Sequence, residues 1–225
     1  MNKLTDIETA VTKVKSGDTL MLGGFTHAGC PYHLLYALGE HPEINNLALV
    51  SSDMGHGLTT YPQGQETLVF NKQVSELIVS FLGRNKRMNE AVASGEVKLT
   101  LVPQGTLVER IRAAGAGIGA FYTPTGVGTV VEEGKETKII NGKKYLLEVP
   151  LKGNVAFVKA QVADKMGNAV FRYSTRTFNI AMATAADIVV LEVEKLVECG
   201  EIEPDQVGLP GVFVDYIVLA DKVVF

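Results

Sequence analysis

Tryptophan is absent from this sequence of 225 residues, and only two cysteines occur, Cys30 and Cys199. Two cysteines cannot form a disulfide framework, and their spacing is not that of a four-ligand zinc site. Long uncharged apolar runs are also missing, so no membrane-spanning helix is expected. The first residues, Met1–Glu8, contain no apolar core of the kind found in signal peptides. These absences predict a cytoplasmic protein that does not enter a membrane.

Positive charge is not in excess, because 21 Lys and Arg residues stand against 25 Asp and Glu residues, a formal net charge of -4. Nucleic acid is therefore not an expected partner, since binding to phosphate backbones depends on clustered basic residues. With 46% hydrophobic residues, the chain is too apolar to be disordered. The histidines show no metal-ligand spacing, so no metal site is expected; they are His27, His33, His41 and His56.

Short apolar segments alternate with amphipathic segments along most of the chain. This alternation is typical of an α/β fold with a mainly parallel sheet and helices on both faces, and we expect a single domain over residues 1–225. The expected strands are 19–22, 47–51, 77–82, 98–102, 188–193 and 214–220, and the expected helices include 7–15, 32–38, 88–94, 106–114 and 178–186.

The middle of the chain has the pattern of an antiparallel hairpin insertion, over about residues 129–175. Asn141-Gly142 stands between two short segments and predicts a tight hairpin turn, because both residues tolerate positive φ. Residues 155–162 and 169–173, separated by a turn, predict a second hairpin-like unit.

Glycine is abundant, with 23 residues, and the first cluster lies between a predicted strand and a predicted helix. In open α/β sheets, ligands bind beyond the carboxyl ends of the strands, and glycine lets a phosphate or acyl group approach the backbone. The cluster is neither a dinucleotide fingerprint nor a Walker loop. A ligand-binding loop and a merely tight turn are equally supported by this pattern, which reads Gly23-Gly24-Phe25-Thr26-His27-Ala28-Gly29.

Gln104 is a second candidate, because it follows Val102-Pro103 at another predicted strand end. Its side-chain amide could donate to a developing oxyanion, although a helix-capping turn is the simpler interpretation. The glycine-rich segments 113–120 and 123–129 are either mobile flaps beside a site or close-packing loops. Cys30 is either an activated thiol at a helix N-terminus or a small packing residue. No carboxylate stands in a turn of small residues, as a nucleophile would.

Several motifs, in this order along the chain, resemble the α subunit of family I coenzyme A transferases, the acetoacetate/3-oxoacid group. The most specific are Pro103-Gln-Gly-Thr-Leu-Val-Glu-Arg-Ile-Arg112 and Thr123-Pro-Thr-Gly-Val-Gly-Thr129. Others cover nearly the whole chain: Leu22-Gly-Gly-Phe25, Gly29 with Pro31, Ala114-Gly-Ala-Gly117, Asn141-Gly142, Ala163-Asp164, Phe178-Asn179 and residues 187–193.

The resemblance implies a scaffold like that of sugar-phosphate isomerases and a ping-pong transfer of coenzyme A between carboxylic acids, through a glutamyl-CoA thioester. In that family the glutamate lies in a Glu-Asn-Gly motif of the β subunit. This chain lacks the motif, so it is expected to be the α subunit of an α2β2 heteromer. The implied substrates are an acyl-CoA and a short-chain acid such as acetate, butyrate or a 3-oxoacid. Coenzyme A is then a substrate, and no tightly bound cofactor is expected.

By the same resemblance, Gln104 donates to the oxyanion, and the residues that bind coenzyme A or substrate are Gly23, Gly24, Phe25, Thr26, His27, Ala28, Gly29 and Ser52. The chain departs from the family where Thr26 and His27 replace the usual glycine and where Ser52 replaces the usual asparagine, which leaves the identity of the acid open. Two alternatives also stay open: a CoA-ester or ring-opening hydrolase subunit on the same scaffold, and a non-catalytic ligand-binding subunit.

Overall fold

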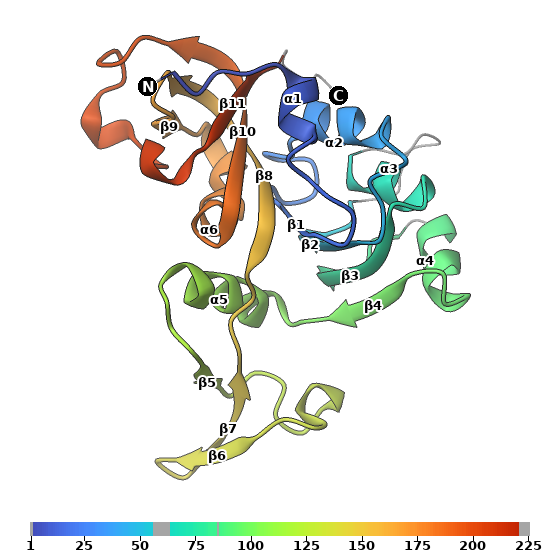
Figure 1. Ribbon diagram of the computed structural model, residues 1–225. Coiled ribbons are helices and arrows are strands. Elements are labelled where there is room, and N and C mark those ends of the chain that lie inside the picture. Colours follow the sequence, from blue (N-terminus) through green and yellow to red (C-terminus); the bar gives the residue numbers. More distant parts are fainter. Residues whose placement is uncertain (1, 56–63, 85, 221–225) are drawn as a thin grey trace.

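The computed structural model describes residues 2–55, 64–84 and 86–220 (Figure 1). Its centre is a large sheet whose strands run parallel in the order β11-β10-β8-β1-β2-β3-β4. These strands are β1 (Thr19–Leu22), β2 (Leu47–Asp53), β3 (Val74–Phe81), β4 (Lys98–Leu101), β8 (Gly153–Asp164), β10 (Ala186–Val197) and β11 (Tyr216–Leu219). The mainly parallel sheet predicted from the alternating apolar segments is therefore confirmed.

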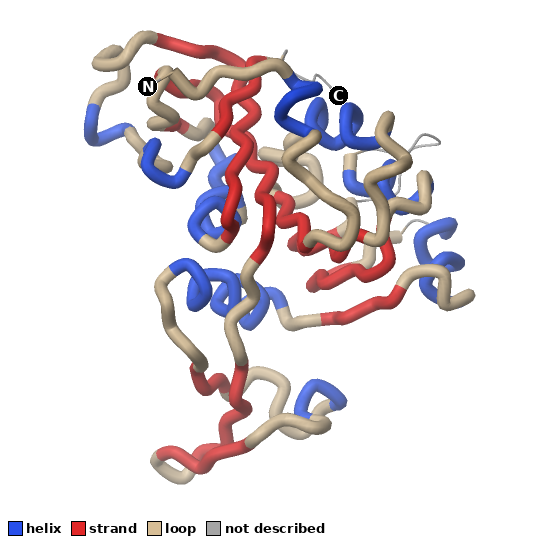
Figure 2. The backbone as a smooth tube through the Cα atoms, viewed as in Figure 1, coloured by secondary structure: helices blue, strands red, loops and turns tan. Residues whose placement is uncertain are grey.

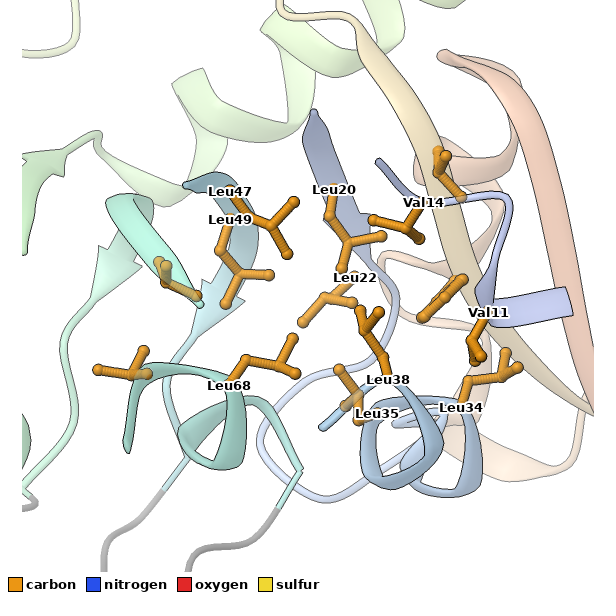
Figure 3. Close-up of a cluster of buried hydrophobic side chains, with 14 of the residues drawn as sticks. Val11, Val14, Leu20, Leu22, Leu34, Leu35, Leu38, Leu47, Leu49 and Leu68 are labelled. Atoms are coloured by element: carbon orange, nitrogen blue, oxygen red, sulfur yellow. The ribbon is translucent and has the colours of Figure 1, made fainter. Parts of the chain in front are cut away.

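Helices cover both faces of this sheet. Successive strand residues point to opposite sides, and the apolar residues on each side are buried under helices. On β1, Leu20 and Leu22 belong to one buried cluster, and Met21 belongs to the other. Figure 3 shows Leu20 and Leu22 beside Leu35 and Leu38 of a covering helix. Burial of each such leucine stabilises the fold by about 1.5–3 kcal/mol. The first cluster lies under α1 (Ile7–Val11), α2 (Tyr32–Gly39), α3 (Gln65–Phe70) and α4 (Lys86–Ala93), and the second under α5 (Gln104–Gly115) and α6 (Asn179–Thr184).

A small antiparallel sheet extends away from the large one (Figures 1 and 2). Its strands are β5 (Phe121–Thr123), β6 (Thr137–Ile140) and β7 (Lys143–Glu148), in the order β5-β7-β6. The turn between β6 and β7 is the expected one, because Asn141 and Gly142 have φ angles of 50° and 76°.

The boundaries of the antiparallel part need correction, since the small sheet covers 121–148 rather than 129–175. Residues 155–162 belong to β8, which lies between β1 and β10 at the centre of the large sheet. β8 does form a short antiparallel pair with β9 (Ala169–Val170), but only at its end. The run Val155-Ala-Phe-Val158 is apolar on both faces, which is the pattern of a central parallel strand.

Short 3-10 helices complete the chain at Val130–Glu132 (η1), Tyr173–Arg176 (η2), Pro204–Gln206 (η3) and Gly211–Phe213 (η4). No helix in the described ranges combines the length and apolarity that spanning a membrane requires.

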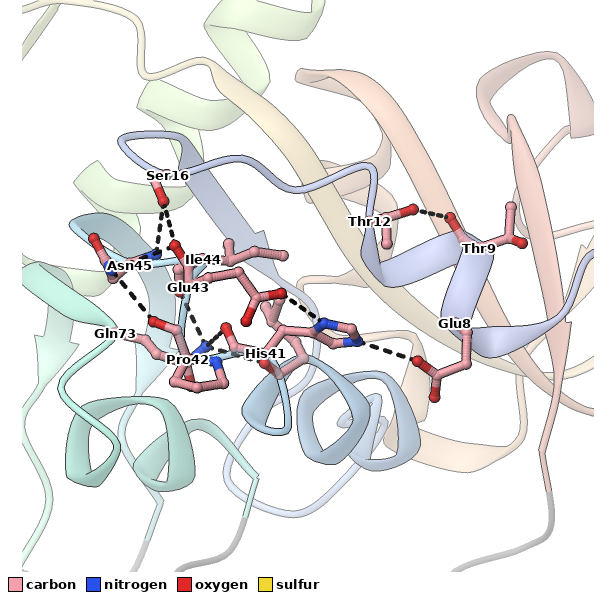
Figure 4. A network of polar contacts seen from close by, with 11 residues as sticks. Glu8, Thr9, Thr12, Ser16, His41, Pro42, Glu43, Ile44, Asn45 and Gln73 are labelled. Carbon is pink, nitrogen blue, oxygen red and sulfur yellow. Dashed lines mark hydrogen bonds and ion pairs between the residues drawn. The ribbon is translucent and has the colours of Figure 1, made fainter.

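Gln73 joins α2 and the loop after it to the start of β3 (Figure 4). The side chain is fully buried, and the two N–H groups of its Nε2 are shared among the carbonyl oxygens of Leu38, His41 and Ile44, each at 3.0 Å. In the same loop, His41 contacts Glu43 and Glu8 at 2.9 and 3.1 Å. The polar network thus fixes the edge of the layer that covers β1 and β2.

Replacing Gln73 with methionine is expected to lower the free energy of unfolding by about 2 kcal/mol. Volume is retained, but the hydrogen bonds from Nε2 to the three carbonyl oxygens are lost. The cost stays moderate because the carbonyls of Leu38 and His41 keep backbone partners. Urea unfolding measures the change, and exposed Gln206→Met serves as the control with little effect. Equal stability of the two variants would contradict this role of Gln73.

Candidate active site

Three segments that follow or end parallel strands meet at one edge of the large sheet. The glycine loop, residues 23–29, follows β1; Ser52 and Asp53 end β2; and Gln104 follows β4. They enclose a cleft of about 430 Å³. The cleft is lined by Phe25, Thr26, Ser52, Asp53, Ser80, Phe81 and Gln104. The structure therefore brings Gln104, Ser52 and part of the glycine loop together, although they are far apart in the sequence.

The glycine loop is a tight turn that lies directly against neighbouring backbone. Phe25 and Ala28 exchange backbone hydrogen bonds of 3.0 Å in both directions. Gly24, Thr26 and Gly29 have φ angles of 101°, 51° and 72°. A Cβ at Gly29 would lie 2.4 Å from the carbonyl oxygen of Thr175, and one at Gly23 would lie 1.7 Å from Asn179 Oδ1. The glycines at these two positions are thus required by packing within the chain.

Asn179, at the start of α6, holds the loop on the β8 side. It is fully buried, and its Nδ2 donates to the carbonyl oxygens of Gly29 and Thr175 at 3.0 and 2.8 Å. Its Oδ1 accepts from the backbone N–H of Lys159 in β8 at 2.9 Å. Sequence reasoning gave Asn179 no role in the site, and the only signal was its place in the Phe178-Asn179 motif.

Asp53, at the end of β2, holds the loop from the opposite side. The residue is 3% exposed; Oδ2 accepts from Thr26 N at 3.0 Å, and Oδ1 accepts from Gly55 N at 2.9 Å. Both oxygens therefore serve to fix backbone. Sequence reasoning also missed this residue, for which the signal was a run of polar residues at the end of a buried strand.

Gln104 is the first residue of α5, and its side chain is exposed at the cleft. Its Nε2 donates to Ser52 Oγ at 3.1 Å. Pro103, with φ of −51°, precedes the helix, and no side chain caps the helix N-terminus. The first N–H groups of a helix carry partial positive charge, so this end of α5 favours negative charge nearby. Gly105 leaves the space above it open.

A second, smaller pocket of about 230 Å³ lies on the other side of the glycine loop. His27, Ala28 and Gly29 form one wall, so the loop separates the two pockets. His27 Nδ1 lies 2.7 Å from the Tyr32 hydroxyl. Lys159, on the facing wall, pairs with the buried Glu192 at 3.1 Å and with Glu194 at 3.8 Å. The remaining lining residues are Ala160, Gln161, Arg172, Tyr173 and Thr175.

Other candidates lie away from the cleft or have a packing role. Cys30 is buried and forms no disulfide with the exposed Cys199. Burial raises the pKa of the Cys30 thiol, so the packing interpretation holds and the activated-thiol interpretation is wrong. Gly115 packs against the backbone of Thr184, and the segment 123–129 lies beside the small sheet.

The histidines do not gather at one place. His33 contacts Glu192, whereas His41 contacts Glu43 and Glu8. His56 lies outside the described residues. Within the ranges that the structure describes, no group of three or more His, Cys, Asp or Glu residues is arranged to hold a metal ion.

Gly29→Ala is expected to lower the free energy of unfolding by roughly 3 kcal/mol, because positive φ and contact with the Thr175 carbonyl both oppose a Cβ. Gly17→Ala is the matched control. Gly17 has φ of 87° with no atom near its Cβ position, so the change should cost about 1 kcal/mol. Thermal unfolding compares the two. An equal loss of stability in the two variants would show that the contact with the Thr175 carbonyl does not add to the cost at Gly29.

Known families and proteins match this chain over nearly its full length. The family Coenzyme A transferase matches residues 4–220. One subunit of the succinyl-CoA:3-ketoacid coenzyme A transferase of Helicobacter pylori is 42% identical, over 99% of this chain and 94% of the relative. The α subunit of the acetate CoA-transferase of Escherichia coli is 42% identical, over 98% of both chains.

A crystal structure of an acyl-CoA transferase apoenzyme from Escherichia coli O157:H7 has a similar fold, with a TM-score of 0.87 and 22% sequence identity. The alignment covers 97% of this chain, which spans about half of that longer protein, or 47%. The motifs, the parallel sheet and these matches agree, and the chain belongs to the coenzyme A transferase family.

Proposed function

We propose that this chain is the α subunit of a heteromeric CoA-transferase that moves coenzyme A from a short-chain acyl-CoA to a short-chain carboxylic acid, with two α and two β subunits. The observation that carries the proposal is the placement of the Gln104 amide over the same cleft as the glycine loop. Relatives support the substrate class, since the similar protein of Clostridium acetobutylicum is an acetoacetyl-CoA:acetate/butyrate CoA transferase α subunit, 41% identical over 96% of this chain.

The proposed reaction begins when a glutamate carboxylate attacks the carbonyl carbon of the acyl-CoA thioester. The C–S bond breaks, coenzyme A leaves as a thiolate, and an acyl-glutamyl anhydride remains. The thiolate then attacks the glutamyl carbonyl, releases the first acid and forms the glutamyl-CoA thioester. The carboxylate of the second acid then attacks the glutamyl-CoA thioester, the same steps run in reverse, and the second acid leaves as its CoA thioester.

Gln104 is proposed to stabilise the negative charge that develops on the thioester oxygen. Nε2 carries two N–H groups, of which one is donated to Ser52. The second N–H can donate to a ligand in the cleft, beside the uncapped N-terminus of α5. Both the amide and the helix end favour an oxyanion at this place.

The attacking glutamate is proposed to come from the β subunit. Among the described residues that line the two pockets, the carboxylates are Asp53 and Glu194. Asp53 uses both oxygens to hold backbone N–H groups, and Glu194 lies near Lys159 in the second pocket. Neither is placed as a nucleophile beside Gln104, so the cleft fits a site completed by another chain.

The glycine loop is proposed to bind the acyl-CoA along both of its sides, through Gly23, Gly24, Phe25, Thr26, His27, Ala28 and Gly29. Phe25 and Thr26 line the cleft with Ser52, whereas His27 borders the second pocket. Thr26 and His27 carry side chains where glycine is usual in the family, so the pocket beside the loop is narrower and more polar. In this proposal coenzyme A is a substrate, and no resident cofactor takes part.

Gln104→Ala is expected to lower kcat about 10²–10³-fold in the enzyme co-purified with its β subunit. Gln104→Glu keeps the size but loses the donor, so it should lose a similar factor. Exposed Gln206→Ala is the control that keeps its activity. Steady-state kinetics and size-exclusion chromatography together check that only the chemistry changes. Normal turnover by Gln104→Ala would remove the oxyanion role.

The chain alone is expected to transfer no coenzyme A, and adding the β subunit should restore transfer. Consumption of acyl-CoA should stop near one equivalent per site when no acceptor acid is present, because coenzyme A stays on the enzyme as the glutamyl-CoA thioester and water does not complete the cycle. Borohydride added after acyl-CoA should inactivate the enzyme and modify a β-subunit glutamate, as peptide mass spectrometry would report. Transfer of coenzyme A by the chain alone would contradict the proposal that the β subunit supplies the glutamate. Sustained loss of acyl-CoA without an acceptor acid would favour a hydrolase.

A further inference from the structure

β2 ends in three polar residues that are almost entirely buried. Ser51, Ser52 and Asp53 are 2%, 0% and 3% exposed. Burying polar groups without hydrogen bonds is unfavourable, so their partners explain why the fold tolerates them. Ser51 Oγ donates to the carbonyl oxygen of Asp53 at 2.9 Å, and the Asp53 carboxylate holds Thr26 and Gly55. Ser52 differs from both because its partner is the exposed Gln104.

Ser52 is less accessible from the cleft than Gln104. Ser52 borders the cleft but has no exposed surface, whereas Gln104 is exposed there. The two side chains meet at 3.1 Å. The Gln104 amide is therefore more accessible to a ligand in the cleft than the Ser52 hydroxyl.

Ser52 is itself held in place by its neighbours. Its carbonyl oxygen accepts from Ser80 Oγ of β3 at 2.5 Å. The next residue, Asp53, is fixed by two backbone N–H groups. The backbone of Ser52 is thus fixed and its side chain is fully buried, so its hydroxyl stays in one place as an acceptor. Glutamine has several rotatable bonds and loses rotamer freedom when it is ordered.

We propose that Ser52 is a positioning residue, which holds the Gln104 side chain so that its second N–H points at the thioester oxygen, and that Ser52 does not itself contact the acid. The inference rests on the proposed role of Gln104. A donor fixed before the reaction needs no reorientation as charge develops, which is the condition for strong oxyanion stabilisation. Without Ser52, the amide would sample other rotamers, and a smaller fraction of molecules would present the donor.

A double-mutant cycle tests this inference in the co-purified heteromer. Ser52→Ala is expected to lower kcat about tenfold, in line with the loss of one neutral hydrogen bond, and to leave KM for the acceptor acid unchanged. In the Gln104→Ala background the same change should have almost no effect on kcat, because Ser52 acts through Gln104. Ser52→Cys, close in size but a weak acceptor, serves as a second variant and should also lower kcat.

Ser51→Ala is the matched control. Ser51 is the adjacent residue, is equally buried and also loses a hydrogen bond, but its hydroxyl bonds to Asp53 rather than Gln104. It should lower the unfolding temperature without the tenfold fall in kcat. Equal losses of kcat for Ser51→Ala and Ser52→Ala would overturn the inference, since both would then act through stability.

The remaining outcomes separate the inference from the proposed function. If Gln104→Ala retains full turnover, the oxyanion proposal fails and the inference fails with it. If Gln104→Ala is slow but Ser52→Ala lowers kcat equally in both backgrounds, only the positioning inference fails. A raised KM for the acceptor acid with unchanged kcat in Ser52→Ala would show direct contact with substrate, which also overturns it.

Discussion

The glycine loop after β1 is held from both sides by buried polar side chains, and the geometry of the site depends on those contacts. β1 lies between β8 and β2 in the sheet. Asn179 joins the loop to β8, and Asp53 joins it to the end of β2. Neutral and charged hydrogen bonds in a buried setting are costly to leave unmade, so each side chain strongly restricts the loop. The loop can therefore line two pockets while keeping Gly24, Thr26 and Gly29 at positive φ.

Parallel strands make this arrangement possible, because all their carboxyl ends lie at one edge of the sheet. The loop after β1, the end of β2 and the start of α5 reach that edge from segments with very different sequence positions. Apolar packing on both faces of the sheet keeps the strand ends in register. The site thus combines a rigid apolar base with a few polar residues, and none of the described carboxylates lining the cleft is left to act as a nucleophile. In the proposed function, this site binds and polarises a thioester that is attacked by a group from another chain.

The small antiparallel sheet has a different physical basis from the large one. Its strands contain one fully buried apolar side chain, Leu146, and the buried carboxylate of Glu148 pairs with Lys135 at 2.5 Å. The sheet is joined to the rest of the chain through α5, where Arg110 Nε donates to the Val149 carbonyl at 2.8 Å. The carbonyl of Arg110 accepts from Leu151 N at 2.9 Å. The helix that begins at Gln104 therefore also fixes the base of this sheet.

The sequence by itself determined the features that depend on neighbouring residues. Apolar runs predicted the strands, Asn141-Gly142 predicted the hairpin turn, and Pro103-Gln104 predicted a strand-to-helix boundary, which is where α5 begins. The motifs predicted the family. For residues 155–162, however, the turn that follows them favoured a hairpin, whereas in the structure they pair with β1 and β10 as a central strand.

Only the tertiary structure decided which distant residues meet. Ser52 and Gln104 are 52 positions apart, and Gly29 and Asn179 are 150 positions apart. Their hydrogen bonds depend on the order of the strands in the sheet, and strand order is not encoded in any local spacing. The burial that makes Cys30 an inert packing residue was decided in the same way. Local chemistry selects the elements, whereas the packing of the whole sheet selects the contacts between them.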